Sequence, residues 1–297
     1  MNAAQFEEKE YETPLYSQLV GGGKNLWTPG QVLEHYLGFD AALSLDDPYL
    51  WHLHGFRNAL RGFSPSRFRW PLLPRNRGLR SRLPRFRINC FIQAKRPQFG
   101  SRVPVKLVSL GPDRPFFKFS IDTDQQNTLE AAAKRFQGRA LFSYAAPVFY
   151  QSRDLFRHTT AGSIVENSTF PDIGSLAGQH AWYYNRPGAV GIANRSFEYR
   201  QMPSLEDRIK GLIGEHESQT EENQSPSAAL AELFSELHDL ITESSNLGDQ
   251  PRAAYLTTEW RRISALEHEI DAPPALFSYL RIEAFATYFN LIWLTIA

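Results

Sequence analysis

The spacing of apolar residues changes along the chain at about residue 204. Before that point, short apolar runs alternate with segments that have the period of a helix, a pattern typical of the α/β class. After Met202-Pro203-Ser204 only the helical period remains. We therefore predict an irregular acidic lead-in over residues 1–27, an α/β domain over residues 28–203 and an acidic helical domain over residues 204–297.

Capping and turn residues set the limits of the predicted α/β elements. Thr28 and Pro29 provide an N-cap followed by proline at the first helical position, and Gly38 ends that helix. Asp122 precedes a second helix, predicted over residues 125–136. The other predicted elements are strands over residues 39–45, 88–95, 116–121 and 139–145 and edge elements over residues 162–170 and 179–184.

The C-terminal part is predicted to form a small helical bundle. Its helices carry apolar residues along one stripe and acidic residues on the other side. A polar linker over residues 215–226 separates the first helix from the others. The predicted helices cover residues 205–213, 227–241, 256–270 and 274–296.

The formal net charge of zero conceals a separation of charge between the two parts. Residues 1–203 contain 26 Lys and Arg against 16 Asp and Glu, whereas residues 204–297 contain 6 against 16. Residues 48–112 contain no acidic residue but fourteen Lys or Arg, of which twelve are Arg. Because arginine makes bidentate contacts with phosphate, this stretch predicts a surface that binds nucleic acid. The alternative is a structural arm that holds an acidic partner, including the protein's own C-terminal region.

Cysteine content and hydropathy exclude two classes of protein. Cys90 is the single cysteine, which excludes a disulfide framework and favours a reducing environment. Residues 1–11 lack the apolar core of a signal peptide. No run of 18 or more apolar residues predicts a membrane span. We expect a cytoplasmic protein without membrane contact.

Two polar residues end the predicted strand over residues 88–95. Gln93 and Lys95 lie two positions apart, so their side chains lie on the same face of the strand. An amide and an ammonium group at the end of a buried strand are unfavourable unless a further group occupies the space between them. A metal ion and a phosphate would satisfy both side chains.

Two carboxylates extend this pair to a candidate catalytic set. Glu34 lies near the end of the first predicted helix, and Asp40 lies in the strand that follows. Carboxylate and amide oxygens suit Mg²⁺ or Mn²⁺, and a lysine stabilises charge that develops on a phosphate. Asp40 and Gln93 are therefore the candidate metal ligands. In the structural alternative, Asp40 is a turn residue, Glu34 faces solvent, and Gln93 and Lys95 end a solvated strand.

The arrangement Glu34, Asp40 and Gln93-x-Lys95 resembles the PD-(D/E)xK nuclease superfamily, in the variant with glutamine in the third motif that Mrr-type enzymes show. Asp40 matches the metal-binding aspartate, Gln93 the second ligand, Lys95 the motif lysine and Glu34 the helix-borne glutamate. The resemblance covers about residues 28–150 and requires an insertion, because 53 positions separate Asp40 from Gln93. It implies a restriction-endonuclease-like mixed sheet flanked by helices and a Mg²⁺-dependent endonuclease that hydrolyses phosphodiester bonds.

The insertion, over about residues 57–87, is predicted to contact nucleic acid. Its arginines alternate with Phe63, Phe68 and Trp70, a combination that neutralises phosphates and stacks on bases. We expect double-stranded DNA as the partner. The candidate nucleic-acid-binding residues are Arg67, Arg69, Arg75, Arg77, Arg80, Arg82, Arg85 and Arg96.

The resemblance further implies the effector nuclease subunit of a bacterial anti-phage defence system. A nuclease of this kind must be held in check, so we expect a protein partner. The apolar stripe of the C-terminal helices is a candidate surface for docking or self-association. The rival hypothesis is a catalytically silent nucleic-acid-binding or scaffold subunit, because glutamine in place of an acid leaves fewer negative ligands for a metal.

Overall fold

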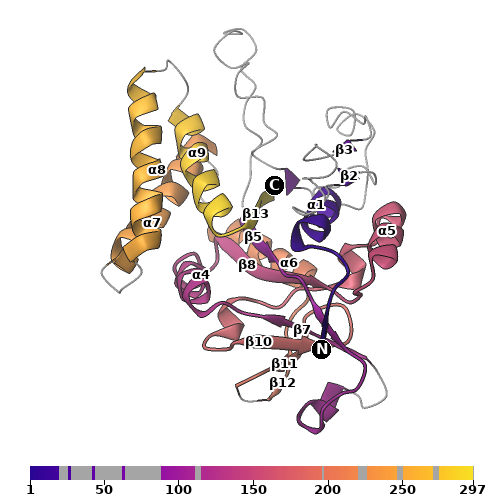
Figure 1. The fold of residues 1–297 in the computed structure, drawn as a ribbon. Coiled ribbons are helices and arrows are strands. Elements are labelled where there is room, and N and C mark those ends of the chain that lie inside the picture. Colours follow the sequence, from indigo (N-terminus) through magenta and orange to yellow (C-terminus); the bar gives the residue numbers. More distant parts are fainter. Residues whose placement is uncertain are drawn as a thin grey trace.

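Two β-sheets pack against each other through aromatic side chains, and helices cover the other side of the second sheet (Figure 1). Phe119 of the first sheet lies 5.4 Å from Tyr144 of the second, between ring centroids. The computed structural model describes residues 1–19, 26–27, 42–43, 62–63, 88–110, 115–195, 197–219, 226–245, 250–269 and 274–296. Within these residues the chain is an α/β protein with a helical C-terminal region, as predicted.

The described strands form two larger sheets and one strand pair. In order of pairing, the first sheet contains β1 (Asn2–Ala3), β6 (Gln98–Gly100), β7 (Phe116–Ser120), β10 (Ala181–Tyr184), β11 (Val190–Ala193) and β12 (Tyr199–Gln201). The second sheet contains β4 (Gly62–Phe63), β13 (Leu291–Ile296), β5 (Ile88–Ala94), β8 (Ala140–Pro147) and β9 (Ser168–Thr169). The pair consists of β2 (Leu26–Trp27) and β3 (Ala42–Leu43).

The helices lie before, between and after these strands. They are α1 (Glu8–Leu19), α4 (Thr123–Arg135), α5 (Ser152–Ala161), α6 (Leu205–Gln219), α7 (Pro226–Ser245), α8 (Gln250–Glu269) and α9 (Pro274–Tyr288). The 3-10 helices within the described residues are η3 (Val105–Leu110), η4 (Val165–Asn167) and η5 (Gly174–Leu176). None of the helices in the described part of the chain is both long and apolar enough to cross a bilayer.

β5 is the centre of the second sheet, and all seven of its residues are buried. It pairs in parallel with β8 and antiparallel with β13. Its side chains alternate, so that Cys90 and Ile92 pack toward α1 and α6, while Phe91 packs toward α4 and α9 and stacks on Phe142 at 4.8 Å. A strand buried on both faces explains the nearly continuous apolar run in its sequence.

Most of the predicted α/β elements that fall within the described residues are confirmed. The strands predicted over residues 88–95, 116–121 and 139–145 are β5, β7 and β8. α4 follows Asp122, whose side chain accepts a hydrogen bond from the Gln125 backbone N–H at 2.8 Å, as its N-cap role predicts. The predicted helix over residues 28–38 lies outside the described residues, as does most of the strand over residues 39–45.

Residues 1–19 of the lead-in predicted to be irregular are instead an ordered part of the core. Asn2–Ala3 forms β1, and α1 packs Tyr11, Leu15 and Leu19 against the same cluster as β5. These three residues recur at helical spacing, so the stripe was present in the sequence. The acidic residues around it and Pro14 within the helix concealed the stripe.

The prediction of one helix over residues 274–296 is wrong in its last third. α9 ends at Tyr288, Asn290 adopts a positive φ of 51°, and Leu291–Ile296 forms β13 beside β5. β13 runs through the middle of the molecule, far from the ends of α7 and α8 (Figure 1). A short apolar run does not distinguish a buried helix from a buried strand, and the free edge of β5 decides in favour of the strand.

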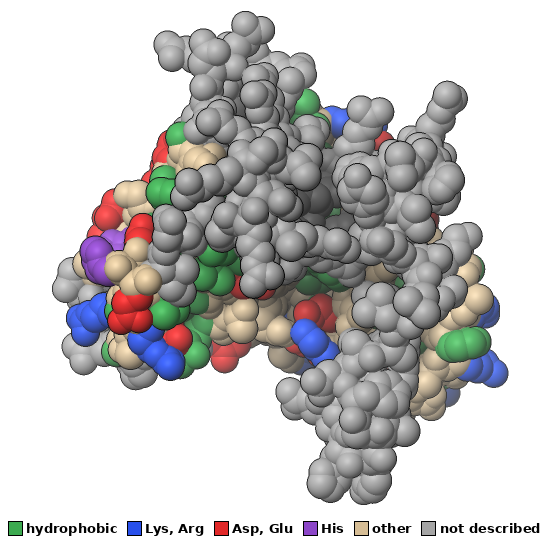
Figure 2. Space-filling view, turned by 90° about the horizontal axis from the view of Figure 1, so that it is seen from above, with side chains coloured by type: hydrophobic (Ala, Val, Ile, Leu, Met, Phe, Trp, Pro, Cys, Tyr) green, Lys and Arg blue, Asp and Glu red, His purple; other side chains and the backbone are tan. Residues whose placement is uncertain are grey.

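The remaining helical predictions are confirmed with different limits. α6 and α7 extend into the linker predicted over residues 215–226, and α8 begins earlier than predicted. The helices α7, α8 and α9 pack on one another through Leu233, Leu237, Leu256, Trp260 and Ile282. In the view from above, acidic, basic and histidine side chains are mixed along the outer edge on the side of these helices (Figure 2).

The acidic face of α7 contacts basic residues at the end of α4. Arg139 pairs with Glu232 at 2.8 Å and also with Glu236. Arg135 pairs with Glu243 at 2.9 Å. The acidic helices thus have a basic partner within the chain, but the arginines that supply it lie outside the predicted Arg-rich insertion.

Candidate active site

The described residues contain part of the predicted site. Gln93, Lys95 and Arg96 lie at the end of β5 and directly after it. The other predicted catalytic residues, Glu34 and Asp40, lie outside the described residues. The same holds for the predicted nucleic-acid-binding residues Arg67, Arg69, Arg75, Arg77, Arg80, Arg82 and Arg85.

Gln93 is held in one orientation by the end of α9. The side chain is only 2% exposed, and its Nε2 donates a hydrogen bond to the backbone oxygen of Phe289 at 2.8 Å. Nε2 of Gln125 donates to the same oxygen, also at 2.8 Å. The two amides satisfy a carbonyl that the end of a helix leaves without an intrahelical partner. This contact is a structural role for Gln93.

The same hydrogen bond leaves the other end of the Gln93 amide free. Its Oε1 is buried and accepts no hydrogen bond from any described residue. A buried carbonyl oxygen without a donor costs free energy, and such atoms call for an explanation in a native protein. A bound cation or the donor of a ligand would supply the missing partner.

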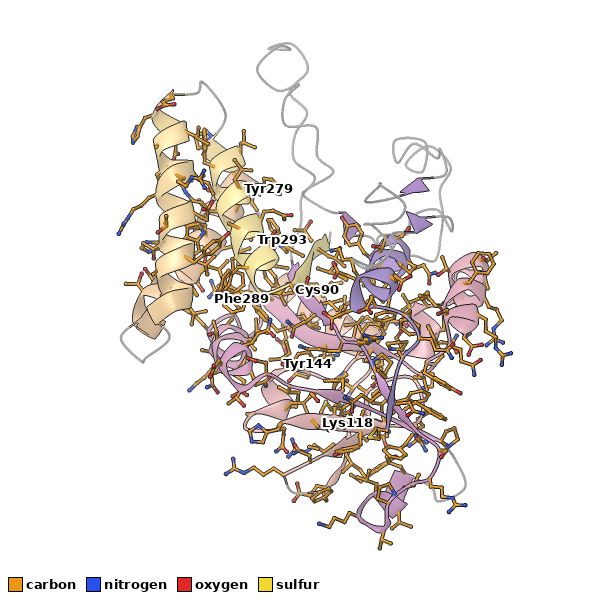
Figure 3. All side chains as sticks on the ribbon, in the orientation of Figure 1. Cys90, Lys118, Tyr144, Tyr279, Phe289 and Trp293 are labelled. Carbon is orange, nitrogen blue, oxygen red and sulfur yellow. The ribbon has the colours of Figure 1, made fainter. Side chains whose placement is uncertain are left out.

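Lys95 extends from the end of β5 across the face that carries Tyr144. Its backbone N–H donates to the oxygen of Ala145 at 2.8 Å, and its Nζ lies 5.4 Å from the centroid of the Tyr144 ring. In Figure 3, Tyr144 lies below and to the right of Phe289. Burial lowers the pKa of Lys95, and the charges of Glu8 and Asp122 act in the opposite direction.

Glu8 supplies a carboxylate that the sequence analysis did not identify. It lies in the first turn of α1, where Oε1 accepts a hydrogen bond from Asn290 Nδ2 at 2.8 Å and Oε2 accepts one from the Arg96 backbone N–H at 3.3 Å. Burial raises the pKa of Glu8, while the charge of Lys95 acts to lower it. The available signal was the acidic segment Glu7-Glu8-Lys9-Glu10, whose helical period was not recognised.

Arg96 has partners within the protein. Its Nη1 pairs with Glu7 at 3.1 Å, and its Nη2 donates to the oxygen of Ala4 at 2.6 Å. These contacts hold the N-terminal segment against the end of β5. The predicted contact between Arg96 and nucleic acid stays a prediction, and it would have to replace or supplement these bonds.

The site combines the Glu8 carboxylate, the amide oxygen of Gln93 and the Lys95 ammonium group in a poorly solvated place. Glu8 and Gln93 both bind the Phe289–Asn290 turn, and Lys95 interacts electrostatically with Glu8. The pKa of Glu8 is raised and that of Lys95 is lowered, so each group is shifted toward its neutral form. Opposed shifts of this kind occur at catalytic sites and also in structural ion pairs.

The donor set fits part of the coordination shell of a hard cation. The Glu8 carboxylate and the free Oε1 of Gln93 are oxygen ligands of the kind that Mg²⁺ prefers. Within the described residues there is no group of three or more His, Cys, Asp or Glu that could hold a metal ion. A cation here would therefore depend on the amide oxygen and on ligands from outside this set.

Comparisons with models of known protein families, with curated proteins and with solved structures give no match. The functional assignment consequently depends on the residues and their geometry.

Proposed function

We propose that the protein is a metal-dependent nuclease whose active site contains Glu8, Gln93 and Lys95. The observation that carries the proposal is the Lys95 ammonium, held in a poorly solvated place near the Glu8 carboxylate and two residues from an amide oxygen without a donor. An ammonium group and an amide oxygen without a donor are unfavourable in a core unless ligands complete them. A phosphodiester bound together with a cation would do so, because the phosphate oxygens accept from the ammonium group and the cation binds the amide oxygen.

The order of elements around β5 supports the proposal. β5 carries Gln93 and Lys95, α4 follows, and β8 then pairs in parallel with β5, while β13 pairs antiparallel on the other edge. A motif strand followed by a helix and a further strand is what the resemblance to PD-(D/E)xK nucleases implies. We propose a restriction-endonuclease-like core on this basis.

Each side chain has a separate role in the proposed reaction. The ammonium group of Lys95 binds a non-bridging phosphate oxygen and stabilises the charge that develops as water attacks phosphorus and the P–O bond to the leaving group breaks. The Glu8 carboxylate keeps Lys95 charged, and together with Oε1 of Gln93 it would hold Mg²⁺ or Mn²⁺. The metal ion would polarise the phosphoryl oxygen and lower the pKa of a bound water.

We propose for Glu8 the kind of role that the resemblance assigns to Glu34, and the assignment of Glu34 stays a prediction. Glu8 lies on a helix, contacts the end of the motif strand through the Arg96 N–H, and is coupled to Lys95. Asp40 stays the predicted metal ligand of the set. DNA as substrate and a role in anti-phage defence are proposals that come from the resemblance alone.

Cleavage of DNA by the purified full-length chain tests the proposal. We expect cleavage of plasmid and linear DNA in Mg²⁺ or Mn²⁺ and none in EDTA. Protein that binds DNA equally well with metal and with EDTA, and cuts under neither condition, would instead be the silent binding subunit. The lack of a carboxylate cluster within the described residues is the observation that favours that rival.

On the alkaline side, the cleavage rate should fall at a lower pH than it would if Lys95 had the usual pKa of a lysine. Burial lowers the pKa of Lys95 from its usual 10.5, so the ammonium group is lost as the pH rises through that lowered value. In a Lys95→Arg variant the guanidinium stays charged, so the alkaline limb of its residual activity should move to higher pH. Initial rates measured against pH for both proteins check this. Alkaline limbs at the same pH in the two proteins would show that Lys95 does not set the limb.

A further inference from the structure

Exposed apolar side chains gather on the outer side of the first sheet. Val105 of η3 is 89% exposed, Phe197 is 39% exposed and Tyr199 of β12 is 42% exposed. η3 packs Leu107 and Leu110 on Ile192 of β11, and Ile192 pairs with Tyr199 across the strands. η3 and Tyr199 therefore lie on the same face of the sheet.

We call this face the η3–β12 surface and define it by the side chains of Val105, Lys106, Val108, Lys118, Phe197 and Tyr199. Lys118, Tyr183, Ile192 and Tyr199 follow one another in register across β7, β10, β11 and β12. Nζ of Lys106 lies 5.3 Å from the centroid of the Phe197 ring, which joins η3 to the turn before β12. Because η3 covers Ile192, which is fully buried, this face presents η3 over the middle of the row and Lys118 and Tyr199 on either side of it.

The charge of this surface is positive. Within the described residues of η3, β12 and the turn before β12, Glu198 is the acidic residue, and it pairs with Arg200 at 3.7 Å. Lys106 and Lys118 form no ion pair with any described residue, and each lies over an aromatic ring. Arg186 donates a hydrogen bond to the hydroxyl group of Tyr199. A polyanion would meet cations that no described carboxylate neutralises.

Phe197 is held out in solvent by a strained backbone. Its φ is 52°, in the left-handed region that a bulky side chain rarely adopts. Strain of this kind persists where the surrounding structure imposes it, and it is concentrated at ligand-binding positions. Its backbone N–H donates to the Ala193 oxygen at 3.0 Å, so the turn between β11 and β12 imposes this conformation and leaves the ring partly exposed.

We propose that the η3–β12 surface binds single-stranded nucleic acid, with bases stacked on Phe197 and Tyr199 and phosphates bound by Lys106 and Lys118. Exposed rings interleaved with cations are the features that bind unpaired strands, because every base has a face that can stack. Bases paired in a duplex do not offer that face. The inference rests on the proposal that the substrate is nucleic acid, but it does not depend on catalysis at Lys95.

The register of the sheet connects this surface with the proposed active site. Lys118 pairs with Gln98 of β6, three residues after Lys95. The row from Gln98 to Tyr199 crosses five strands, a distance of about 19 Å at the usual spacing of strands. Lys118 lies below Tyr144 in Figure 3. η3 covers Ile192 in this row, so a bound nucleic acid would pass over η3 between Tyr199 and Lys118, and Lys118 pairs with the strand that follows Lys95.

A second copy of the chain fits this surface less well. β12 is the edge of the sheet, so two copies could pair there, but it has three residues and its neighbours are cationic. A two-fold axis would bring Lys106 and Arg186 of one copy toward the same residues of the other. Like charges brought together in this way oppose association.

Fluorescence anisotropy with a labelled oligothymidine of 20 nucleotides in EDTA tests the inference on the full-length protein. Tyr199→Ala should weaken binding by about tenfold, the effect of losing one stacked base, and Tyr199→Phe should keep most of the affinity. Lys106→Ala should lower the slope of log K against log salt by about 1. The matched controls are Phe156→Ala, which removes a ring 73% exposed on α5, and Lys134→Ala, which removes an exposed lysine on α4. Both controls should bind as the wild type does.

The outcomes separate this inference from the proposed nuclease. Metal-dependent cleavage with unchanged binding by Tyr199→Ala and Lys106→Ala would overturn the inference and leave the nuclease intact. Binding that depends on these residues, without cleavage in any metal, would support the inference and overturn the nuclease. Equal affinity of the wild type for the oligothymidine and for a duplex, binding to phosphatidylserine vesicles in place of the oligonucleotide, or dimerisation lost in Tyr199→Ala would each overturn the inference.

Discussion

Replacing Lys95 with alanine is expected to reduce the rate of metal-dependent DNA cleavage by about 100- to 1,000-fold, with nucleic-acid binding retained. This is the usual effect of removing one group that stabilises charge in a transition state. The variant loses the ammonium group that faces the proposed phosphate, whereas the surfaces proposed to bind the rest of the substrate are unchanged. Single-turnover cleavage and anisotropy, measured on the same preparations, check both parts of the expectation.

A structural role for Lys95 has to be separated from a catalytic one. Among the described residues, Lys95 is the cation whose charge lowers the pKa of Glu8, so its loss leaves the carboxylate with two hydrogen bonds and destabilises a poorly solvated site. Lys95→Met keeps the aliphatic part of the side chain, and Glu8→Gln removes the opposite charge. If all three variants lose activity while their thermal transitions stay cooperative, the role is chemical. Lys134→Ala is the control for loss of a lysine.

Wild-type activity in Lys95→Ala would exclude the proposed site. Loss of activity in proportion to the fraction unfolded would make the Glu8–Lys95 pair a structural ion pair. In either case the free Oε1 of Gln93 would need another explanation.

Replacing Trp293 with alanine should lower the free energy of unfolding by about 3–5 kcal/mol, the range for large-to-small changes of a buried aromatic residue. Trp293 is buried in β13, where its ring stacks on Phe91 at 6.2 Å and on Tyr279 at 5.8 Å. Its Nε1 donates to Asn89 Oδ1 at 3.1 Å, so the change also leaves a buried acceptor without its donor. Urea titration of the variant and the wild type gives the difference, provided that the m-values agree.

We expect Trp293→Ala also to disturb the hydrogen bonds of Glu8 and Gln93 in the proposed active site. β13 begins one residue after Asn290, which donates to Glu8, and two residues after Phe289, which accepts from Gln93. Trp293→Phe keeps the stacking and loses only the Nε1 hydrogen bond, so its effect should be smaller. Phe156→Ala, at an exposed aromatic residue, should change stability by less than about 0.5 kcal/mol. A similar small change in Trp293→Ala would show that β13 does not hold the second sheet together.

Local signals in the sequence were sufficient for several features of the fold and the site. The strands containing Gln93, Phe119 and Tyr144 were predictable because each is an apolar run bounded by turn residues. α4 was predictable because Asp122 accepts from an N–H only three residues later. Gln93 and Lys95 lie on the same face because side chains alternate along a strand, and this alternation is a local property of the backbone.

Other features depend on contacts between residues far apart in the sequence. The amide of Gln93 is oriented by a carbonyl 196 residues away, and the carboxylate of Glu8 accepts from an amide 282 residues away. No local sequence pattern predicts either hydrogen bond. For example, the residues around Glu8 do not indicate that the start of α1 lies beside the end of β5. The surroundings of Gln93 and Glu8 therefore depend on tertiary structure.

The sequence by itself determined that an amide and an ammonium group would share one side at the end of a buried strand, because strand geometry is local. Tertiary structure alone decided which groups surround them. The apolar run Leu291–Ile296 is compatible with a helix or a strand, and it became β13 because β5 offers an unpaired edge where its backbone hydrogen bonds and its side chains are both satisfied. That pairing brings the Phe289–Asn290 turn to Gln93 and Glu8 and so completes the candidate active site.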